Sequence, residues 1–178
     1  LAALTILSRE LGPYWQSQVL LIRASQALVD GRLEAVEALV EDAARLTGED
    51  GDASFLRLPF RFELARLTGA VGPLVPAVEA AVEPLPFVAR VWWCTALKEC
   101  GQRAQVADEW ASLAPALRDV PAGAPEFLMI LVDAADLAAW LGDEPTGAAL
   151  YDALAPYAGL HAIPHATGPY QGPVDLAL

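Results

Sequence analysis

The strongest constraint in this sequence is a helical hydrophobic pattern that glycines interrupt at regular intervals. Over residues 33–46, for example, apolar side chains form one stripe, and mostly acidic side chains occupy the opposite side. The breaks fall at Gly31, Gly69, Gly101 and Gly142, which are 38, 32 and 41 residues apart. Spacings of this size are typical of helical hairpins that stack, because one hairpin cannot bury its apolar face alone. The pattern therefore predicts an all-α fold.

The expected helices follow from this pattern and from the turn residues, and essentially no β-sheet is expected. They span 1–10, 14–29, 32–47, 54–68, 73–84, 87–100, 103–117, 124–141 and 145–156, and a further helix starts near residue 173. Pro13, Pro73 and Pro125 lie where a helix is expected to begin, a position that proline tolerates. Residues 48–53, 119–124 and 158–172 are expected to be loops.

Length and charge limit the classes of protein that the chain can belong to. The 178 residues predict a single domain over 1–178, and the start at Leu1 without methionine indicates a fragment of a longer protein. The net charge of −12 argues against a surface for nucleic acid or for an anionic membrane. This charge also leads us to expect that the chain does not bind DNA. No phosphate-binding loop precedes Lys98, the only lysine, so we expect that it does not bind ATP either. We expect no catalytic activity and no cofactor.

Cys94 and Cys100 are the only cysteines. They lie six residues apart on one expected helix and therefore point in different directions, so they are not expected to bridge each other. Unpaired cysteines and the lack of a signal peptide predict a cytoplasmic protein.

The repeats fit the tetratricopeptide pattern in part. Relative to three of the turn glycines, the small residue expected seven positions earlier is Ala24, Cys94 or Ala135, and the large residue nine positions later is Val40, Trp110 or Tyr151. The hairpin at Gly69 departs from the pattern with Phe62 at the small position, and the closing proline falls in place only at Pro86. The sequence thus predicts a divergent, tetratricopeptide-like solenoid of stacked antiparallel helical hairpins.

Four segments carry a resemblance to a known family. They are residues 8–15 (SRELGPYW), 29–35 (VDGRLEA), 150–159 (LYDALAPYAG) and 172–178 (GPVDLAL). These segments resemble the tetratricopeptide-like C-terminal region of large bacterial signalling proteins, which join a STAND-type ATPase to a LuxR-type or SARP-type DNA-binding domain or to a nucleotide cyclase. The resemblance implies a regulatory, signal-sensing role that depends on protein partners. It assigns a catalytic role to none of the residues.

Other polar clusters have a simpler structural interpretation. His161 and His165 are four residues apart, but Pro164 separates them in an expected loop, which argues against a zinc site. The acidic stretch 49–52 lacks the ligand spacing of a calcium loop. Asp133 and Asp136 share a helix face that we expect to be solvated. We therefore expect no metal site.

Arg57, Arg61, Trp92 and Trp93 are the candidate binding residues. All four lie on the first helix of an expected hairpin, and first helices line the concave groove of a solenoid. Core packing of the tryptophans and internal ion pairs of the arginines are the alternative. Trp92 and Trp93 can both be buried only if their helix is covered on two sides.

Three functions remain open from the sequence. The first is an interaction and signal-sensing module of a bacterial transcriptional regulator, which binds a partner protein, another domain of its own parent chain or a small effector. The second is a small-molecule-binding helical domain with an enclosed aromatic pocket. The third is a helical enzyme, for which no acid–base set is visible. The two ends are expected to expose apolar surface, through which the chain could self-associate.

Overall fold

The fold is all-α in a computed structural model that describes residues 2–48, 55–82 and 86–178. The acidic stretch 49–52 lies outside these residues. Contacts between residues group the chain into two compact units: residues 1–68 with 165–170, and residues 69–164 with 171–178. The single domain expected over 1–178 stays a prediction.

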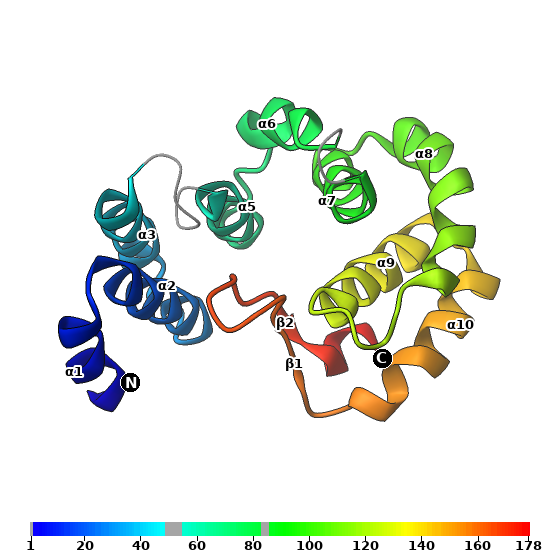
Figure 1. The fold of residues 1–178 in the computed structure, drawn as a ribbon. Coiled ribbons are helices and arrows are strands. Elements are labelled where there is room, and N and C mark those ends of the chain that lie inside the picture. Colours follow the sequence, from blue (N-terminus) through cyan, green and yellow to red (C-terminus); the bar gives the residue numbers. More distant parts are fainter. Residues whose placement is uncertain (1, 49–54, 83–85) are drawn as a thin grey trace. The chain divides into compact units, whose positions relative to one another are not determined.

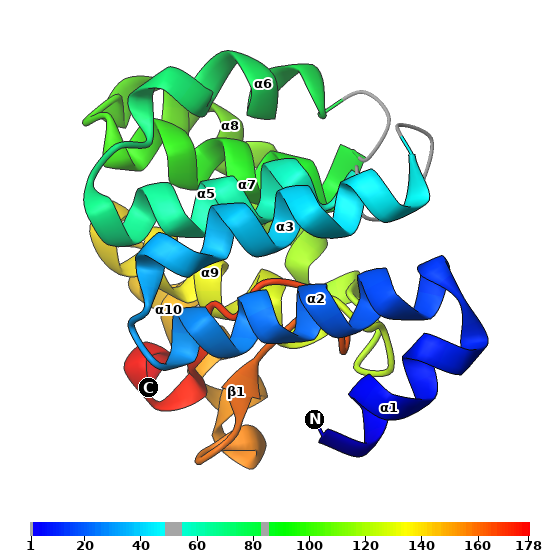
Figure 2. The ribbon, with the colours of Figure 1, turned by 90° about the vertical axis from the view of Figure 1, so that its left-hand side faces the viewer.

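The first unit is built from helices α1, α2, α3 and α5, together with the segment 165–170 (Figure 1). The bounds of these helices are Ala2–Leu11 for α1, Pro13–Val29 for α2, Leu33–Thr47 for α3 and Arg57–Thr68 for α5. Helix α2 packs against α1 and against α3, and α3 also packs against α5. Figure 2 shows α2 and α3 side by side. This position between two neighbours is what the nearly all-round apolar sequence of α2 predicts.

The core of the first unit lies mainly between α2 and α3. The middle of the expected stripe of α3 is buried there, with Val36, Val40 and Ala43 at most 2% exposed, whereas Leu46 at its end is 37% exposed. Leu21 and Ala24 of α2 are fully buried in the same cluster. Tyr170 packs against this core, so a residue far along the chain completes the first unit.

The second unit contains helices α6 to α10 and the end of the chain (Figure 1). Its elements are η1 (Gly72–Leu74), α6 (Val75–Ala80), α7 (Pro86–Glu99), α8 (Arg103–Ala116), η2 (Leu117–Asp119), α9 (Phe127–Leu141), α10 (Glu144–Leu154), η3 (Ala155–Tyr157), β1 (His161–Ala162), β2 (Gly172–Pro173) and η4 (Val174–Ala177), where η denotes a 3₁₀ helix. Helix α7 packs against α6, α8 and α9, and α9 packs against α10.

The expected glycine breaks are confirmed, and their geometry explains them. The four glycines have φ between +68° and +77°, the left-handed region that residues with a Cβ rarely adopt. After α9, Gly142 N–H donates to Ala139 O and Asp143 N–H donates to Ala138 O. The same pair of bonds follows α7 at Gly101. This is the Schellman arrangement, which satisfies carbonyl groups at a helix end.

Long-range polar contacts join the helices of the second unit. Arg103, at the start of α8, donates hydrogen bonds to the carbonyl oxygens of Trp140 and Leu141 at the end of α9, at 2.5 and 2.9 Å. Its guanidinium also lies 5.0 Å from the centre of the Trp140 ring. A cation at a helix C-terminus is favourable because it faces the negative end of the helix dipole. Lys98 of α7 pairs with Asp136 of α9 at 2.5 Å.

The structure corrects several expected boundaries. The helix expected from residue 173 is instead the strand β2, paired antiparallel with β1, followed by the 3₁₀ helix η4, because Gly172 has a positive φ of +121° and Pro173 is extended. The helix expected over 73–84 is a 3₁₀ turn followed by the short α6; residues 83–84 lie outside the described residues. Helix α9 begins at Phe127 rather than at 124, since Pro125 lies in a turn. Helix α8 ends at Ala116 and continues as η2.

Candidate functional site

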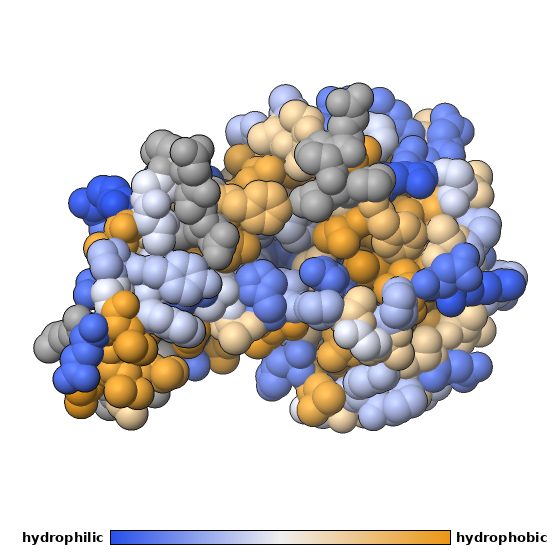
Figure 3. Space-filling model, in the orientation of Figure 1, coloured by the Kyte–Doolittle hydropathy of each residue, from blue (hydrophilic) through white to orange (hydrophobic). Residues whose placement is uncertain are grey.

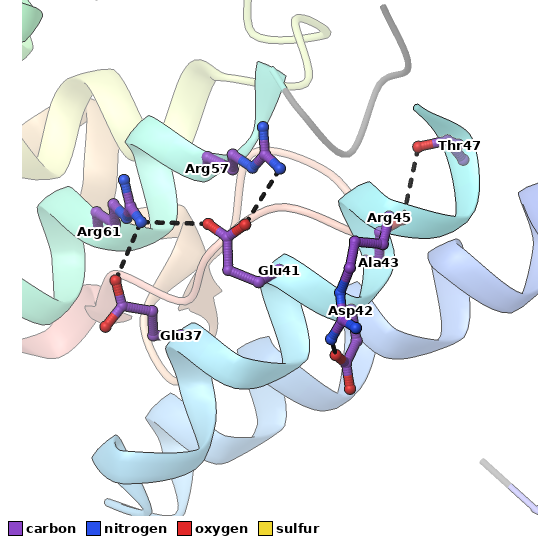
Figure 4. A network of polar contacts seen from close by, with 8 residues as sticks. All are labelled: Glu37, Glu41, Asp42, Ala43, Arg45, Thr47, Arg57 and Arg61. Atoms are coloured by element: carbon purple, nitrogen blue, oxygen red, sulfur yellow. Dashed lines mark hydrogen bonds and ion pairs between the residues drawn. The ribbon is translucent and has the colours of Figure 1, made fainter. Parts of the chain in front are cut away.

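Arg57 and Arg61 of α5 point toward α3, where two glutamates face them (Figure 4). Arg57 Nη2 lies 3.1 Å from Glu41 Oε2. Arg61 Nη2 lies 3.1 Å from Glu37 Oε1 and 3.2 Å from Glu41 Oε1. Internal carboxylates thus balance the charge of both arginines, which is the alternative role that the sequence left open. A role of these arginines in binding a ligand stays a prediction.

Trp92 and Trp93 occupy adjacent positions on α7 in the second unit. Trp92 is a core residue with 8% of its surface exposed, and Trp93 is half-buried. Both can be covered because α6, α8 and α9 all pack against α7. Within the described residues, the indole Nε1 of Trp93 is buried without a hydrogen-bond partner. The candidate arginines and tryptophans therefore belong to different units, and their binding role stays a prediction.

The two aspartates of α9 differ in environment. Asp136 is half-exposed and pairs with Lys98, whereas Asp133 is only 1% exposed. The expected solvated face is therefore wrong for Asp133, because both α7 and α10 pack against α9. His161 lies in β1 of the second unit, and His165 belongs to the first unit, where its Nδ1 is 3.1 Å from Thr167 Oγ1. In the described ranges, no group of three metal-binding side chains comes together.

An apolar groove lies in the first unit between α1, α2 and the segment 165–167. We call it the α1–α2 groove; its volume is about 410 Å³, and it is lined by Leu4, Leu7, Ser8, Leu11, Trp15, Gln18, Val19, Ile22, His165, Ala166 and Thr167. Leu4, Leu7, Leu11 and Trp15 are each about half exposed, at 49–59%. Figure 3 shows hydrophobic surface over the N-terminal helix. The expected exposure of apolar side chains at this end is confirmed.

A second groove lies in the second unit between α8 and α10. We call it the α8–α10 groove; its volume is about 560 Å³, and it is lined by Trp110, Ala111, Ala114, Pro115, Leu117, Arg118, Val120, Phe127, Leu131, Asp143, Thr146, Ala149, Leu150 and Ala153. The large apolar side chains that form its floor are buried, whereas Ala111, Pro115, Arg118 and Ala149 along its walls are exposed. The groove thus runs open to solvent between two helices.

Asp143 supplies a carboxylate to the α8–α10 groove. It caps α10, and its Oδ1 accepts a hydrogen bond from Thr146 N–H at 3.2 Å. Its Oδ2 accepts one from Trp110 Nε1 at 2.9 Å. Hydrogen bonding from Thr146, and next from Trp110, lowers the pKa of Asp143 below its usual value, so this carboxylate is charged at neutral pH.

The sequence signals only part of these grooves. An aspartate after the turn Gly142, with Thr146 three residues later, is an N-cap pattern that could have identified Asp143 as a helix cap. Nothing in the sequence pairs Asp143 with Trp110, which lies 33 residues earlier. The residues of both grooves were therefore missed as candidates.

The protein is all-α, and each of its two units carries a groove that is open to solvent. Comparison with models of known protein families, with curated proteins and with solved structures found no match to this chain. None of the helices in the described ranges has the length and apolar character needed to cross a membrane.

Proposed function

We propose that this chain is a non-catalytic helical-repeat interaction and signal-sensing module of a bacterial transcriptional regulator. The α1–α2 groove is the observation that carries the interaction role. Single exposed apolar residues are common on proteins, but a groove that gathers several of them marks a surface for a partner. Leu4, Leu7, Leu11 and Trp15 form such a group, and each is about half exposed.

The regulatory context comes from the resemblance of four segments to the C-terminal region of STAND-type signalling proteins. The glycines that separate successive helices support this proposal, because a tetratricopeptide-like solenoid is built from helical hairpins. The alternative, a small-molecule-binding domain, needs an enclosed aromatic pocket that covers most of its ligand. Both grooves have exposed residues along their walls, which favours a macromolecular partner over an enclosed small ligand.

Site-specific photo-crosslinking in the full-length gene product tests the interaction role. A photoreactive residue replaces Leu7, which lines the groove, or Ile6, which is 63% exposed on the same helix but does not line it. We expect one discrete protein adduct when the photoreactive residue is at position 7, and none when it is at position 6. The adduct from position 7 should be lost when the same protein also carries Leu11→Asp. The same adduct from both positions, or none from position 7, would contradict an interaction at this groove.

The regulatory role is tested separately with Leu7→Asp and Ile6→Asp. Both changes are at exposed positions, so we expect both variants to fold with unchanged circular dichroism. Transcript levels in the native host should change with Leu7→Asp only. An unchanged transcriptome with Leu7→Asp, together with the expected adduct from a photoreactive residue at position 7, would retain the interaction and reject the regulatory role.

A further inference from the structure

The α8–α10 groove carries a negative charge at one end. Asp143 is held there by hydrogen bonds from Trp110 and Thr146. A carboxylate offers about four acceptor positions, so a donor from outside can still bind it. Glu144 follows in the chain but does not line the groove. This end therefore suits a cationic side chain.

The other end carries a positive charge. Arg118 lies in η2, eight residues after Trp110, which corresponds to about 13 Å along the helix at about 1.5 Å per residue in α8 and about 2.0 Å in η2. It is exposed, and it makes no hydrogen bond or ion pair within the part of the chain that the structure describes. Asp119 follows it but does not line the groove. This end suits an anionic side chain.

The space between the two charges suits the apolar face of a helix. Its floor contains buried aromatic and aliphatic side chains, among them Phe127 and Leu131. Its walls carry small side chains, Ala111 and Ala114 on α8 and Ala149 on α10, which let a partner backbone approach closely. An open groove between helices is a common site for an amphipathic helix, which inserts side chains at i, i+3, i+4 and i+7.

We propose that the α8–α10 groove binds an amphipathic helix of a protein partner. A lysine or arginine of that helix pairs with Asp143, and an aspartate or glutamate two turns along it pairs with Arg118. Apolar side chains between these two contact the floor of the groove. The inference goes beyond the proposed function, because this second surface lies in the other unit and its binding does not depend on the α1–α2 groove.

The probe is a synthetic alanine-based helix of about 18 residues, long enough to be helical in part, with Lys, Leu, Leu and Glu at i, i+3, i+4 and i+7. It is titrated into the isotope-labelled 178-residue chain, and amide chemical shifts are recorded. We expect shifts at the residues that line the groove, with Arg118→Glu weakening binding about tenfold, which corresponds to the loss of about 1.4 kcal/mol. Arg45→Glu, which makes the same change of charge at an exposed site in the first unit, should have no effect.

A second peptide, with lysine in place of the glutamate, shows whether Arg118→Glu weakens binding through the loss of charge pairing or through misfolding of the variant. It should bind Arg118→Glu better than it binds the native chain. Equal binding of the first peptide to the native chain and to Arg118→Glu, or no shifts at the groove with millimolar peptide, would overturn the proposal. Shifts at the groove with a free zwitterionic amino acid such as tryptophan but not with the peptide would assign the groove to a small ligand instead, and would also overturn it.

Discussion

The indole Nε1 of Trp110 donates a 2.9 Å hydrogen bond to Oδ2 of Asp143, and Asp143 also caps α10. One carboxylate therefore joins helix α8 to the turn between α9 and α10. We expect Asp143→Ala to lower the free energy of unfolding by about 1–2 kcal/mol, the usual cost of losing an N-cap. Asp143→Asn should cost less, because the single carbonyl oxygen of asparagine can still cap α10, although its NH₂ group cannot accept the indole hydrogen bond. Urea unfolding measures both; a native-like stability of Asp143→Ala would contradict this role.

The same carboxylate makes stability depend on pH. Its folded pKa is lowered, mainly by hydrogen bonding from Thr146, so its contribution is present above the unfolded pKa of about 3.9 and is lost as the pH falls through the lower folded value. Below about pH 4, the native chain should lose stability more steeply than Asp143→Asn. If the free energies of unfolding of the two proteins fall in parallel as the pH is lowered, Asp143 contributes nothing to acid sensitivity.

Two glycines of the last hairpin should respond to alanine in opposite directions. Gly142 has φ +77°, so Gly142→Ala should destabilise the protein by about 1 kcal/mol. Gly147 lies inside α10, and a Cβ there would meet nothing within 4 Å. Gly147→Ala should therefore stabilise the helix by about 0.5–1 kcal/mol. Thermal unfolding of both variants checks this. A shift of the melting temperature in the same direction for both variants would disprove the assigned turn geometry.

The two cysteines should differ in reactivity toward iodoacetamide. Cys94 is fully buried, and burial raises the pKa of its thiol to about 12, whereas Cys100 is exposed. The thiolate is the reactive form. The folded variant Cys94→Ser, which keeps Cys100, should therefore be labelled quickly. The variant Cys100→Ser, which keeps Cys94, should be labelled only after denaturation. Mass spectrometry follows the modification. Equal rates for the two folded variants would mean that the α7 core opens easily.

The two glutamates that form ion pairs between α3 and α5 should contribute unequally to the free energy of unfolding. Glu41 is 34% exposed and faces both Arg57 and Arg61, whereas Glu37 is 57% exposed and, among the residues that the structure describes, pairs only with Arg61. Glu41→Gln should lower the free energy of unfolding by about 1 kcal/mol, and Glu37→Gln by less than about 0.5 kcal/mol. High salt should reduce the difference. Chemical denaturation at two salt concentrations measures it, and a larger effect of Glu37→Gln would reverse the ranking.

The sequence by itself determined the local structure of this protein. Helical hydrogen bonds join residues four apart, and Gly31, Gly69, Gly101 and Gly142 adopt a conformation that disfavours side chains, so helices and breaks can be identified without the fold. The burial of Val36, Val40 and Ala43 on α3 followed from the same short-range periodicity. The pattern did not resolve the exact ends of helices near Pro125 and Ala116, where turn and 3₁₀ geometry compete with the helix.

Only the tertiary structure decided which distant residues meet. Residues 172–173 form a strand because they pair with residues 161–162, an interaction that local propensity does not contain. Asp133 is buried because other helices cover its face. The partners of Arg57 and Trp110 lie 16 and 33 residues away, at Glu41 and Asp143. Grooves form where the packing of whole helices leaves space between them, so their residues have no signature within any single helix.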